Sequence, residues 1–141
     1  PLASVVTPNI PEAELLLGHA IASDGDAATA LTELLALGAP AVLLKGGHLA
    51  AGDEVIDLFS QRLDDGERIR RELRHPRLEL RAHGTGCTLA AAIAAQLALG
   101  MSLADACHAA SDYVHRALRL GTRPGHSDIV VLDHFGAAQS A

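Results

Sequence analysis

The segment His83–Thr88 holds the residue types that could bind an anion and carry out chemistry on it. Gly84 and Gly86 flank Thr85, and Cys87 follows immediately. A glycine turn that opens a helix leaves backbone N–H groups without partners, and the helix dipole adds partial positive charge at that end. This environment suits an anion such as phosphate, and it also favours a thiolate at Cys87.

A tight turn with a buried cysteine accounts for the same segment equally well when the segment is taken alone. The spacing departs from the dinucleotide-binding pattern Gly-x-Gly-x-x-Gly because residue 89 is leucine. It also departs from the nucleotide-binding P-loop because no Lys-Ser or Lys-Thr pair follows the glycines. An anion site and a structural turn therefore both stay open at this point.

Lys45 is the only lysine in the chain, and the other ten basic residues are arginines. It lies between the apolar run Val42–Leu44 and the pair Gly46–Gly47. The carboxyl ends of strands are where open α/β sheets place their ligands, so a compact ammonium there could meet a phosphate. A solvated surface charge is the alternative for the same residue.

Asn9 and Glu12 follow a short segment, Leu2–Val6, that we expect to form a strand. Pro11 suits the first turn of a helix, which places Glu12 near the amino end of that helix. Compensation of the helix dipole would explain the acid without any further role. Alternatively, Asn9 and Glu12 lie where an α/β sheet binds its ligands.

The remaining pattern predicts strands alternating with helices, as in an α/β protein. Residues 89–99 are apolar on almost every side, so that helix is expected to be buried. The segment Glu67–Leu73 is expected to pair with Val55–Phe59 around an Asp-Asp-Gly turn, although it could also be helical. The other predicted elements are helices over 11–17, 24–37 and 103–118, and extended segments over 40–44 and 129–132.

Composition excludes several classes of function. The 141 residues suffice for one domain, and a net charge of −6 with 2% aromatic residues argues against a nucleic-acid partner. No apolar run is suited to cross a bilayer, and the sequence opens without a secretory leader, so we expect a cytoplasmic protein without a membrane partner. Cys87 and Cys107 form neither a disulfide framework nor a zinc pattern.

Three motifs in register are more specific than any one of them. Thr7–Glu14, Val42–Leu49 and His83–Leu89 together resemble the hydroxymethylpyrimidine and phosphomethylpyrimidine kinases of thiamine biosynthesis, which belong to the ribokinase-like group. Gly125-His126 and Asp133–Phe135 resemble the carboxyl end of those enzymes. The resemblance implies a three-layer αβα fold with a mostly parallel sheet, in which residues 1–141 form the carboxyl-terminal part of a single kinase domain.

The same resemblance implies a reaction. Such kinases transfer the γ-phosphoryl group of ATP to 4-amino-5-hydroxymethyl-2-methylpyrimidine and then to its monophosphate. The backbone of Gly84, Thr85 and Gly86 would form an anion hole for the transferring group. Cys87 stands where most ribokinase-like enzymes have an aspartate, and it would deprotonate the substrate hydroxyl.

The resemblance also assigns the binding of cofactors. Asn9 and Glu12 match an Asn-x-x-Glu motif and would hold Mg²⁺, through water. Lys45 would meet the phosphates of ATP, and the loop around Gly125 would lie near the adenine. The full-length protein is expected to be a homodimer.

The length of the chain departs from this pattern. The sequence begins where the middle of such a kinase is expected, and its first residue is proline. We therefore expect a fragment, a split chain or a truncated product, with an open sheet edge, weak nucleotide binding and poor turnover on its own.

Three other functions stay open. One is a pyridoxal or pyridoxine kinase of the same group, and another is a non-catalytic nucleotide-binding half. The third is a thiol enzyme in which His83 would serve as the base for Cys87, which requires the imidazole to lie within hydrogen-bond reach of the sulfur.

Overall fold

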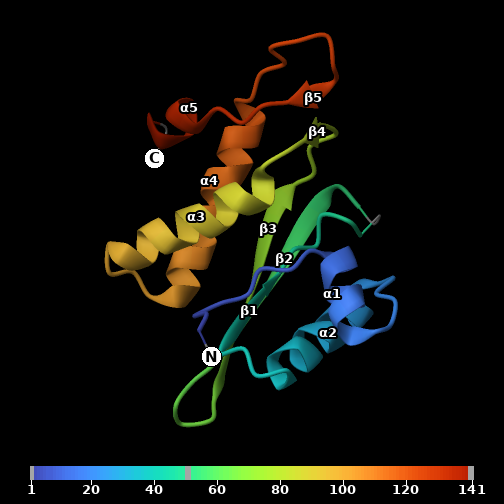
Figure 1. Ribbon diagram of the computed structural model, residues 1–141, viewed down its shortest axis with the longest axis vertical. Coiled ribbons are helices and arrows are strands. Elements are labelled where there is room, and N and C mark those ends of the chain that lie inside the picture. Colours follow the sequence, from blue (N-terminus) through green and yellow to red (C-terminus); the bar gives the residue numbers. More distant parts are fainter. Residues whose placement is uncertain (1, 50–51, 140–141) are drawn as a thin grey trace. The chain divides into compact units, whose positions relative to one another are not determined.

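A computed structural model describes residues 2–49 and 52–139 of the chain (Figure 1). The chain divides into two compact units, Pro1–Arg77 and Leu78–Ala141. Among the described residues, none of the helices combines the length and the apolar character needed to cross a membrane.

The amino-terminal unit contains two helices that each begin at a polar cap. The helix α1 (Ile10–Leu17) begins after Asn9 and ends at Gly18, which has a left-handed conformation with φ of 78°. The helix α2 (Asp24–Ala36) begins after Ser23, whose side chain accepts a hydrogen bond from the backbone N–H of Asp26. The predicted helices over 11–17 and 24–37 are thus confirmed to within a residue.

The sheet of this unit has three strands in the order β1-β2-β3. Both pairs are antiparallel, with β1 (Ala41–Leu44) against β2 (Glu54–Arg62) and β2 against β3 (Arg68–Pro76). Figure 1 shows β2 and β3 as a long hairpin. The predicted hairpin is therefore confirmed with longer strands, and the helical alternative for residues 67–73 is wrong.

The segment before α1 does not form the predicted strand over Leu2–Val6. It makes two isolated parallel bridges to the chain around β1, at Val6↔Val42 and Asn9↔Lys45. Between these bridges lies Pro8, which has no N–H to donate to a ladder, so a regular strand cannot continue. The direction of pairing is still the one that a strand-helix-strand unit requires.

The core of the amino-terminal unit lies between the helices and β1. All four residues of β1 are buried, as a strand covered on both faces should be. The buried residues packed together in this core are Ile10, Ala13, Ile21, Ala27, Ala30, Leu31, Leu34, Leu35, Val42 and Leu44.

An apolar groove of about 830 Å³ borders the segment before α1. Its lining includes Leu2, Leu15 and Leu37, whose side chains are exposed. Thr7, which also lines the groove, forms no backbone hydrogen bond with any other residue in the described ranges. The groove and the unpaired backbone agree with the open edge expected from the sequence.

The carboxyl-terminal unit is built on a pair of packed helices. The helix α3 (Thr85–Ala98) packs against α4 (Leu103–Arg119), and α5 (His134–Gln139) packs against α4. Two short strands, β4 (Arg81–Ala82) and β5 (Ile129–Val130), pair in parallel. The predicted helix over 103–118 is confirmed, and Ala106, Cys107, Ala110 and Ala117 on it are buried.

The prediction that α3 is buried on all sides is wrong for this chain. Only Leu89 and Ile93 are buried, whereas Ala90 and Ala94 are exposed. The helix α4 covers one stripe of α3, and a helix that is apolar all round needs further partners to bury the rest. The composition of a helix shows which faces it can bury, but it does not supply the elements that cover them.

Candidate active site

Asn9 and Glu12 hold each other in a capping box at the start of α1. The Oδ1 atom of Asn9 accepts a hydrogen bond from the N–H of Glu12 at 2.8 Å. In return, Oε2 of Glu12 accepts one from the N–H of Asn9, also at 2.8 Å. Each residue thereby satisfies a backbone donor that the helix cannot pair, so the Asn-x-x-Glu motif has a structural task in this chain.

The structure brings Lys45 beside Asn9. The two residues form a parallel bridge, and the N–H of Lys45 donates to the carbonyl of Pro8 at 2.9 Å. Residues paired across neighbouring strands lie about 5 Å apart, so the pair Asn9 and Glu12 lies close to the backbone of Lys45, which is far from them in the sequence. Lys45 is half-buried, and no carboxylate within the described ranges forms an ion pair with its ammonium.

Gly46 follows Lys45 at a point where the chain passes close to β2. A β-carbon at residue 46 would lie 2.0 Å from the carbonyl oxygen of Ile56, so only glycine fits. The N–H of Gly46 donates to Oδ1 of Asp57 at 2.9 Å. These two restraints fix the backbone of the loop where it leaves β1, directly after Lys45.

The second group of candidates lies at the amino end of α3. Gly84 precedes the helix with φ of 83°, a left-handed conformation that glycine adopts without strain. No side chain caps this end, and the first helical hydrogen bond runs from the N–H of Thr88 to the carbonyl of Gly84 at 2.9 Å. The N–H groups of Thr85, Gly86 and Cys87 therefore have no acceptor within the helix, as the sequence predicted.

Cys87 is exposed and borders a cavity of about 530 Å³ within the carboxyl-terminal unit. Tyr113 and His134 line the same cavity, and their rings stack with centroids 6.3 Å apart. The hydroxyl of Tyr113 also donates to the carbonyl of His134 at 3.2 Å. The exposure of Cys87 contradicts the alternative in which this turn merely buries a cysteine.

No motif in the sequence marks Tyr113 as a neighbour of Cys87. Tyr113 is the only tyrosine in a chain with very few aromatic residues, and that rarity was the one available signal. The remaining lining of the cavity consists of Thr88, Ala91, Ala92, Ala95 and Gln96.

The two cysteines differ sharply in their surroundings. Cys107 is fully buried in α4, and burial raises the pKa of its thiol to about 11, because a thiolate would lose its hydration there. In the described part of the chain, no hydrogen bond joins the ring of His83 to the sulfur of Cys87. The requirement of the thiol-enzyme hypothesis, an imidazole bonded to the sulfur, is not met.

The side-chain oxygens of Asn9 and Glu12 could bind a magnesium ion only together with further ligands such as water and phosphate. In residues 2–49 and 52–139, no three side chains of His, Cys, Asp or Glu gather in a metal-binding cluster. Glu12 contributes one exposed carboxylate, whose Oε2 atom is engaged in the capping box. Mg²⁺ commonly uses one or two carboxylates together with water and substrate phosphates, and that mode fits this chain.

Comparison with known proteins shows which family this chain resembles. A sequence model described as phosphomethylpyrimidine kinase matches residues 1–131. The chain is 50% identical over 125 residues to a hydroxymethylpyrimidine/phosphomethylpyrimidine kinase of Rhizobium meliloti, covering 87% of this chain and 45% of that protein. It is 48% identical over 139 residues to the thiamine biosynthesis bifunctional protein ThiED of Geobacter sulfurreducens, covering 99% of this chain and 27% of that protein.

A solved structure shows the same fold. The ADP complex of Bacillus subtilis pyridoxal kinase superposes with a TM-score of 0.86 at 29% identity, covering 99% of this chain and 52% of that one. The predicted ribokinase-like α/β fold is thereby confirmed. The described residues do not show the predicted mostly parallel sheet, because β1, β2 and β3 pair antiparallel, and parallel pairing is limited to β4 with β5 and to two isolated bridges. The chain spans about half the length of the kinases to which it is similar.

Proposed function

The chain belongs to the phosphomethylpyrimidine kinase family, and from this premise we propose that it supplies the carboxyl-terminal part of an ATP-dependent pyrimidine kinase. The substrates are 4-amino-5-hydroxymethyl-2-methylpyrimidine and its monophosphate, in thiamine biosynthesis. One observation carries the proposal: an exposed Cys87 directly follows a glycine turn with unbonded amides and borders a cavity.

The carboxyl-terminal unit contributes the groups for the chemical step. The N–H groups of Gly84, Thr85 and Gly86 donate to the oxygens of the transferring phosphoryl group, where negative charge spreads in the transition state. Cys87, in its thiolate form, accepts the proton of the substrate hydroxyl as the oxygen attacks the γ-phosphorus. The bond from that phosphorus to the oxygen it shares with the β-phosphate breaks, and ADP leaves. Phosphoryl transfer relies on positioning and charge stabilisation, so these few groups are sufficient on this side.

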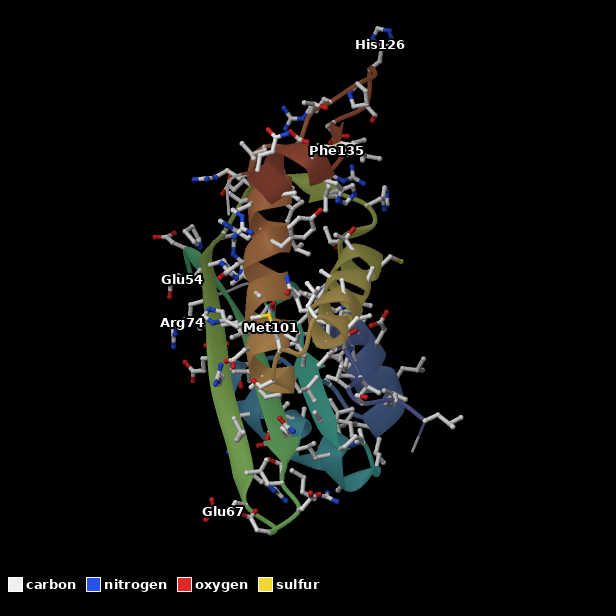
Figure 2. The ribbon with its side chains drawn as sticks, turned by 90° about the vertical axis from the view of Figure 1, so that its left-hand side faces the viewer. Glu54, Glu67, Arg74, Met101, His126 and Phe135 are labelled. Carbon is white, nitrogen blue, oxygen red and sulfur yellow. The ribbon has the colours of Figure 1, made fainter. Side chains whose placement is uncertain are left out.

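The amino-terminal unit contributes groups that bind the nucleotide. Lys45 donates from its ammonium to the phosphates of ATP. Glu12, with Asn9 beside it, would hold Mg²⁺ through water, and the ion would supply positive charge to neutralise the phosphates. The loop around Gly125 lies near the adenine, and Figure 2 shows His126 at the far tip of that loop.

Both units are proposed to belong to one kinase domain that is complete only with an amino-terminal half like that of the relatives. The relatives are about twice as long as this chain, which supports that view. We further propose that the completed protein is a cytoplasmic homodimer.

A pyridoxal kinase is the second candidate, because the Bacillus subtilis pyridoxal kinase shares the fold at a TM-score of 0.86. The identity to that protein is 29%, whereas the identity to the Rhizobium meliloti pyrimidine kinase is 50%. The difference in identity favours the pyrimidine as the substrate.

The test is a phosphoryl-transfer assay with ATP and Mg²⁺, using the pyrimidine alcohol, its monophosphate and pyridoxal in parallel. The chain is measured alone and after co-expression with the amino-terminal half of the Rhizobium meliloti relative. We expect phosphorylated pyrimidine from the complemented protein and little product from the chain alone. Preferential phosphorylation of pyridoxal would contradict the proposed substrate, and ATP binding without any product would indicate a non-catalytic nucleotide-binding half.

A further inference from the structure

Arg77, at the end of the amino-terminal unit, binds the loop that begins with Lys45. Among the described residues, its guanidinium donates only to backbone carbonyls. Nε donates to Gly52 at 3.2 Å and Nη1 to Gly47 at 3.4 Å. Nη2 donates to Leu49 at 2.8 Å and to Glu54 at 3.2 Å. The backbone N–H of Arg77 adds a bond to the carbonyl of Asp53 at 2.7 Å. One residue therefore ties together the outgoing and returning arms of a single loop.

These bonds also fix the direction of the loop's amides. In a planar trans peptide the carbonyl and the N–H point in opposite directions. Because the carbonyl of Gly47 points to Arg77, the N–H of His48 points away from the guanidinium. The carbonyl of Gly46 accepts from the N–H of Leu49 at 3.0 Å, which turns the N–H of Gly47 away from that bond as well.

The two amides turned outward are accessible. Gly47 and His48 are both exposed, and neither N–H has a partner among residues 2–49 and 52–139. Successive unpaired N–H groups in a turn attract anions, and Lys45 lies two residues before the first of them. The loop therefore presents two amides to solvent shortly after Lys45, while Arg77 holds the carbonyls of Gly47 and Leu49.

The charge of Arg77 adds to this arrangement. Across the described residues no carboxylate oxygen contacts its guanidinium, in contrast to Arg74 on β3, which bonds Glu54 and Glu72. Figure 2 shows Arg74 and Glu54 together on the strand face. Carbonyl dipoles hold Arg77 in place without cancelling its net charge, so the loop next to Lys45 keeps an uncompensated cation.

We propose that Arg77 is a positioning residue for nucleotide phosphates: it holds the loop after Lys45 so that the amides of Gly47 and His48 face the anion. This inference rests on the proposed function, because the anion is taken to be the polyphosphate of ATP. Arg77 acts through the loop and does not itself touch the nucleotide.

The first measurement is hydrogen exchange of the peptide covering residues 46–54, in the wild-type chain and in Arg77→Gln, Arg77→Lys and Arg74→Gln. We expect exchange in that loop to quicken by about tenfold or more in Arg77→Gln, since the bonds that close the loop are lost. Arg77→Lys should fall between the two, and Arg74→Gln should match the wild type. Unchanged exchange in α2 shows that the variants are folded, and a loop equally protected in Arg77→Gln would overturn the proposal.

The second measurement separates positioning from a general loss of stability. In the complemented protein, Arg77→Gln should raise the KM for ATP by about ten- to a hundredfold, because a misplacement of about 1 Å can cost roughly that much. The KM for the pyrimidine alcohol should stay unchanged, and Arg77→Lys should recover part of the loss. Equal increases in both KM values would count against a role at the phosphates. A wild-type protein that binds no ATP would instead refute the proposed function, whatever the loop exchange shows.

Discussion

The two units present their candidate groups in opposite ways. In the amino-terminal unit, Asn9 and Glu12 are bonded to each other and Gly46 is bonded to Asp57. In the carboxyl-terminal unit, the glycine turn has no side-chain cap and Cys87 is exposed beside a cavity. A change in the first unit should therefore disturb stability and binding together, whereas a change in the second should affect chemistry with little effect on folding.

Replacement of Cys87 should give the largest effect on the reaction. Loss of a general base costs about 10²- to 10⁴-fold in rate, so Cys87→Ala in the complemented protein should lose that much kcat with ATP binding preserved. Cys107→Ala is the matched control, because Cys107 is fully buried. It should lower the melting temperature and leave the rate per folded molecule close to that of the wild type. Full activity in Cys87→Ala would remove the proposed base.

The cysteine pair gives a second readout of the same contrast. Iodoacetamide at pH 8 should label Cys87 in the folded chain and spare Cys107, whose pKa is raised to about 11 by burial. Because the folded pKa of Cys107 lies above the unfolded value of 9.0, its contribution to stability is present below pH 9 and is lost as the pH rises toward 11.

Lys45 should affect nucleotide binding more than the chemical step. Charge-assisted hydrogen bonds contribute roughly 1.5–3 kcal/mol, so Lys45→Ala should raise the KM for ATP by about 10- to 100-fold. Lys45→Arg keeps the charge and should recover part of the affinity. Titration with ATP by calorimetry, beside the steady-state KM, checks this, and an unchanged KM in Lys45→Ala would contradict the assignment.

Gly46 tests whether stability and binding are joined in the amino-terminal unit. A β-carbon at residue 46 would lie 2.0 Å from the carbonyl oxygen of Ile56, whereas one at Gly47 would have its nearest neighbour at 3.9 Å. Gly46→Ala should therefore cost about 1–3 kcal/mol of unfolding free energy, as overpacking does. Gly47→Ala is the matched control, and urea unfolding of both variants gives the comparison. Equal unfolding free energies of Gly46→Ala and Gly47→Ala would show that β2 shifts to make room for the added β-carbon at little cost.

The sequence predicted the parts of this fold whose signals are local. The helices over 11–17 and 24–37 and the hairpin around residues 64–66 follow from residue types and patterns close together in the sequence. The predicted strand over Leu2–Val6 is wrong, because only Val6 of that segment pairs with β1 and Pro8 prevents the pairing from continuing regularly to Asn9. The burial of α3 failed because burial depends on partners that no local pattern contains.

The candidate site was predictable to a similar extent. The motifs indicated Asn9, Lys45 and Cys87. Asn9 caps α1, Lys45 follows β1 and Cys87 lies in the first turn of α3, while their roles in binding and chemistry stay predictions. Arg77 and Tyr113 could not be identified, because their roles depend on contacts with residues more than 20 positions away. Pairing across such distances leaves no periodicity in the sequence.

Asn9 and Glu12 allow helix capping to be separated from metal binding. Asn9→Ala removes the cap and should cost about 1 kcal/mol, as measured by urea unfolding. Glu12→Gln keeps a capping box, which accepts glutamine, but removes the carboxylate charge. This variant should unfold like the wild type and need a higher concentration of Mg²⁺ for half-maximal activity. An unchanged requirement for Mg²⁺ would reduce the motif to its structural task.

The smallest expected effect concerns His19 and shows whether the bonding of the amino-terminal unit extends to its surface. The Nδ1 atom of His19 lies 3.2 Å from the carbonyl of Ala20, and Nε2 lies 2.8 Å from Oε2 of Glu33. Both partners are acceptors, so both bonds form together only when the ring carries two protons, and the carbonyl and the carboxylate raise the pKa of His19.

Because the folded pKa of His19 is raised above the ordinary value of 6.5, its contribution to stability is full below that pH and is lost as the pH rises through the raised pKa. Melting temperatures of the wild type and His19→Gln should therefore differ at about pH 5.5 and coincide at about pH 9. Glu33→Gln should reduce the difference at low pH, since it removes the charge that favours the imidazolium. The side chains of His19 and Glu33 are 47% and 43% exposed, so solvent screening keeps the effect small. A difference that persists at about pH 9 would mean that the ring stabilises this unit by its contacts and not by its charge.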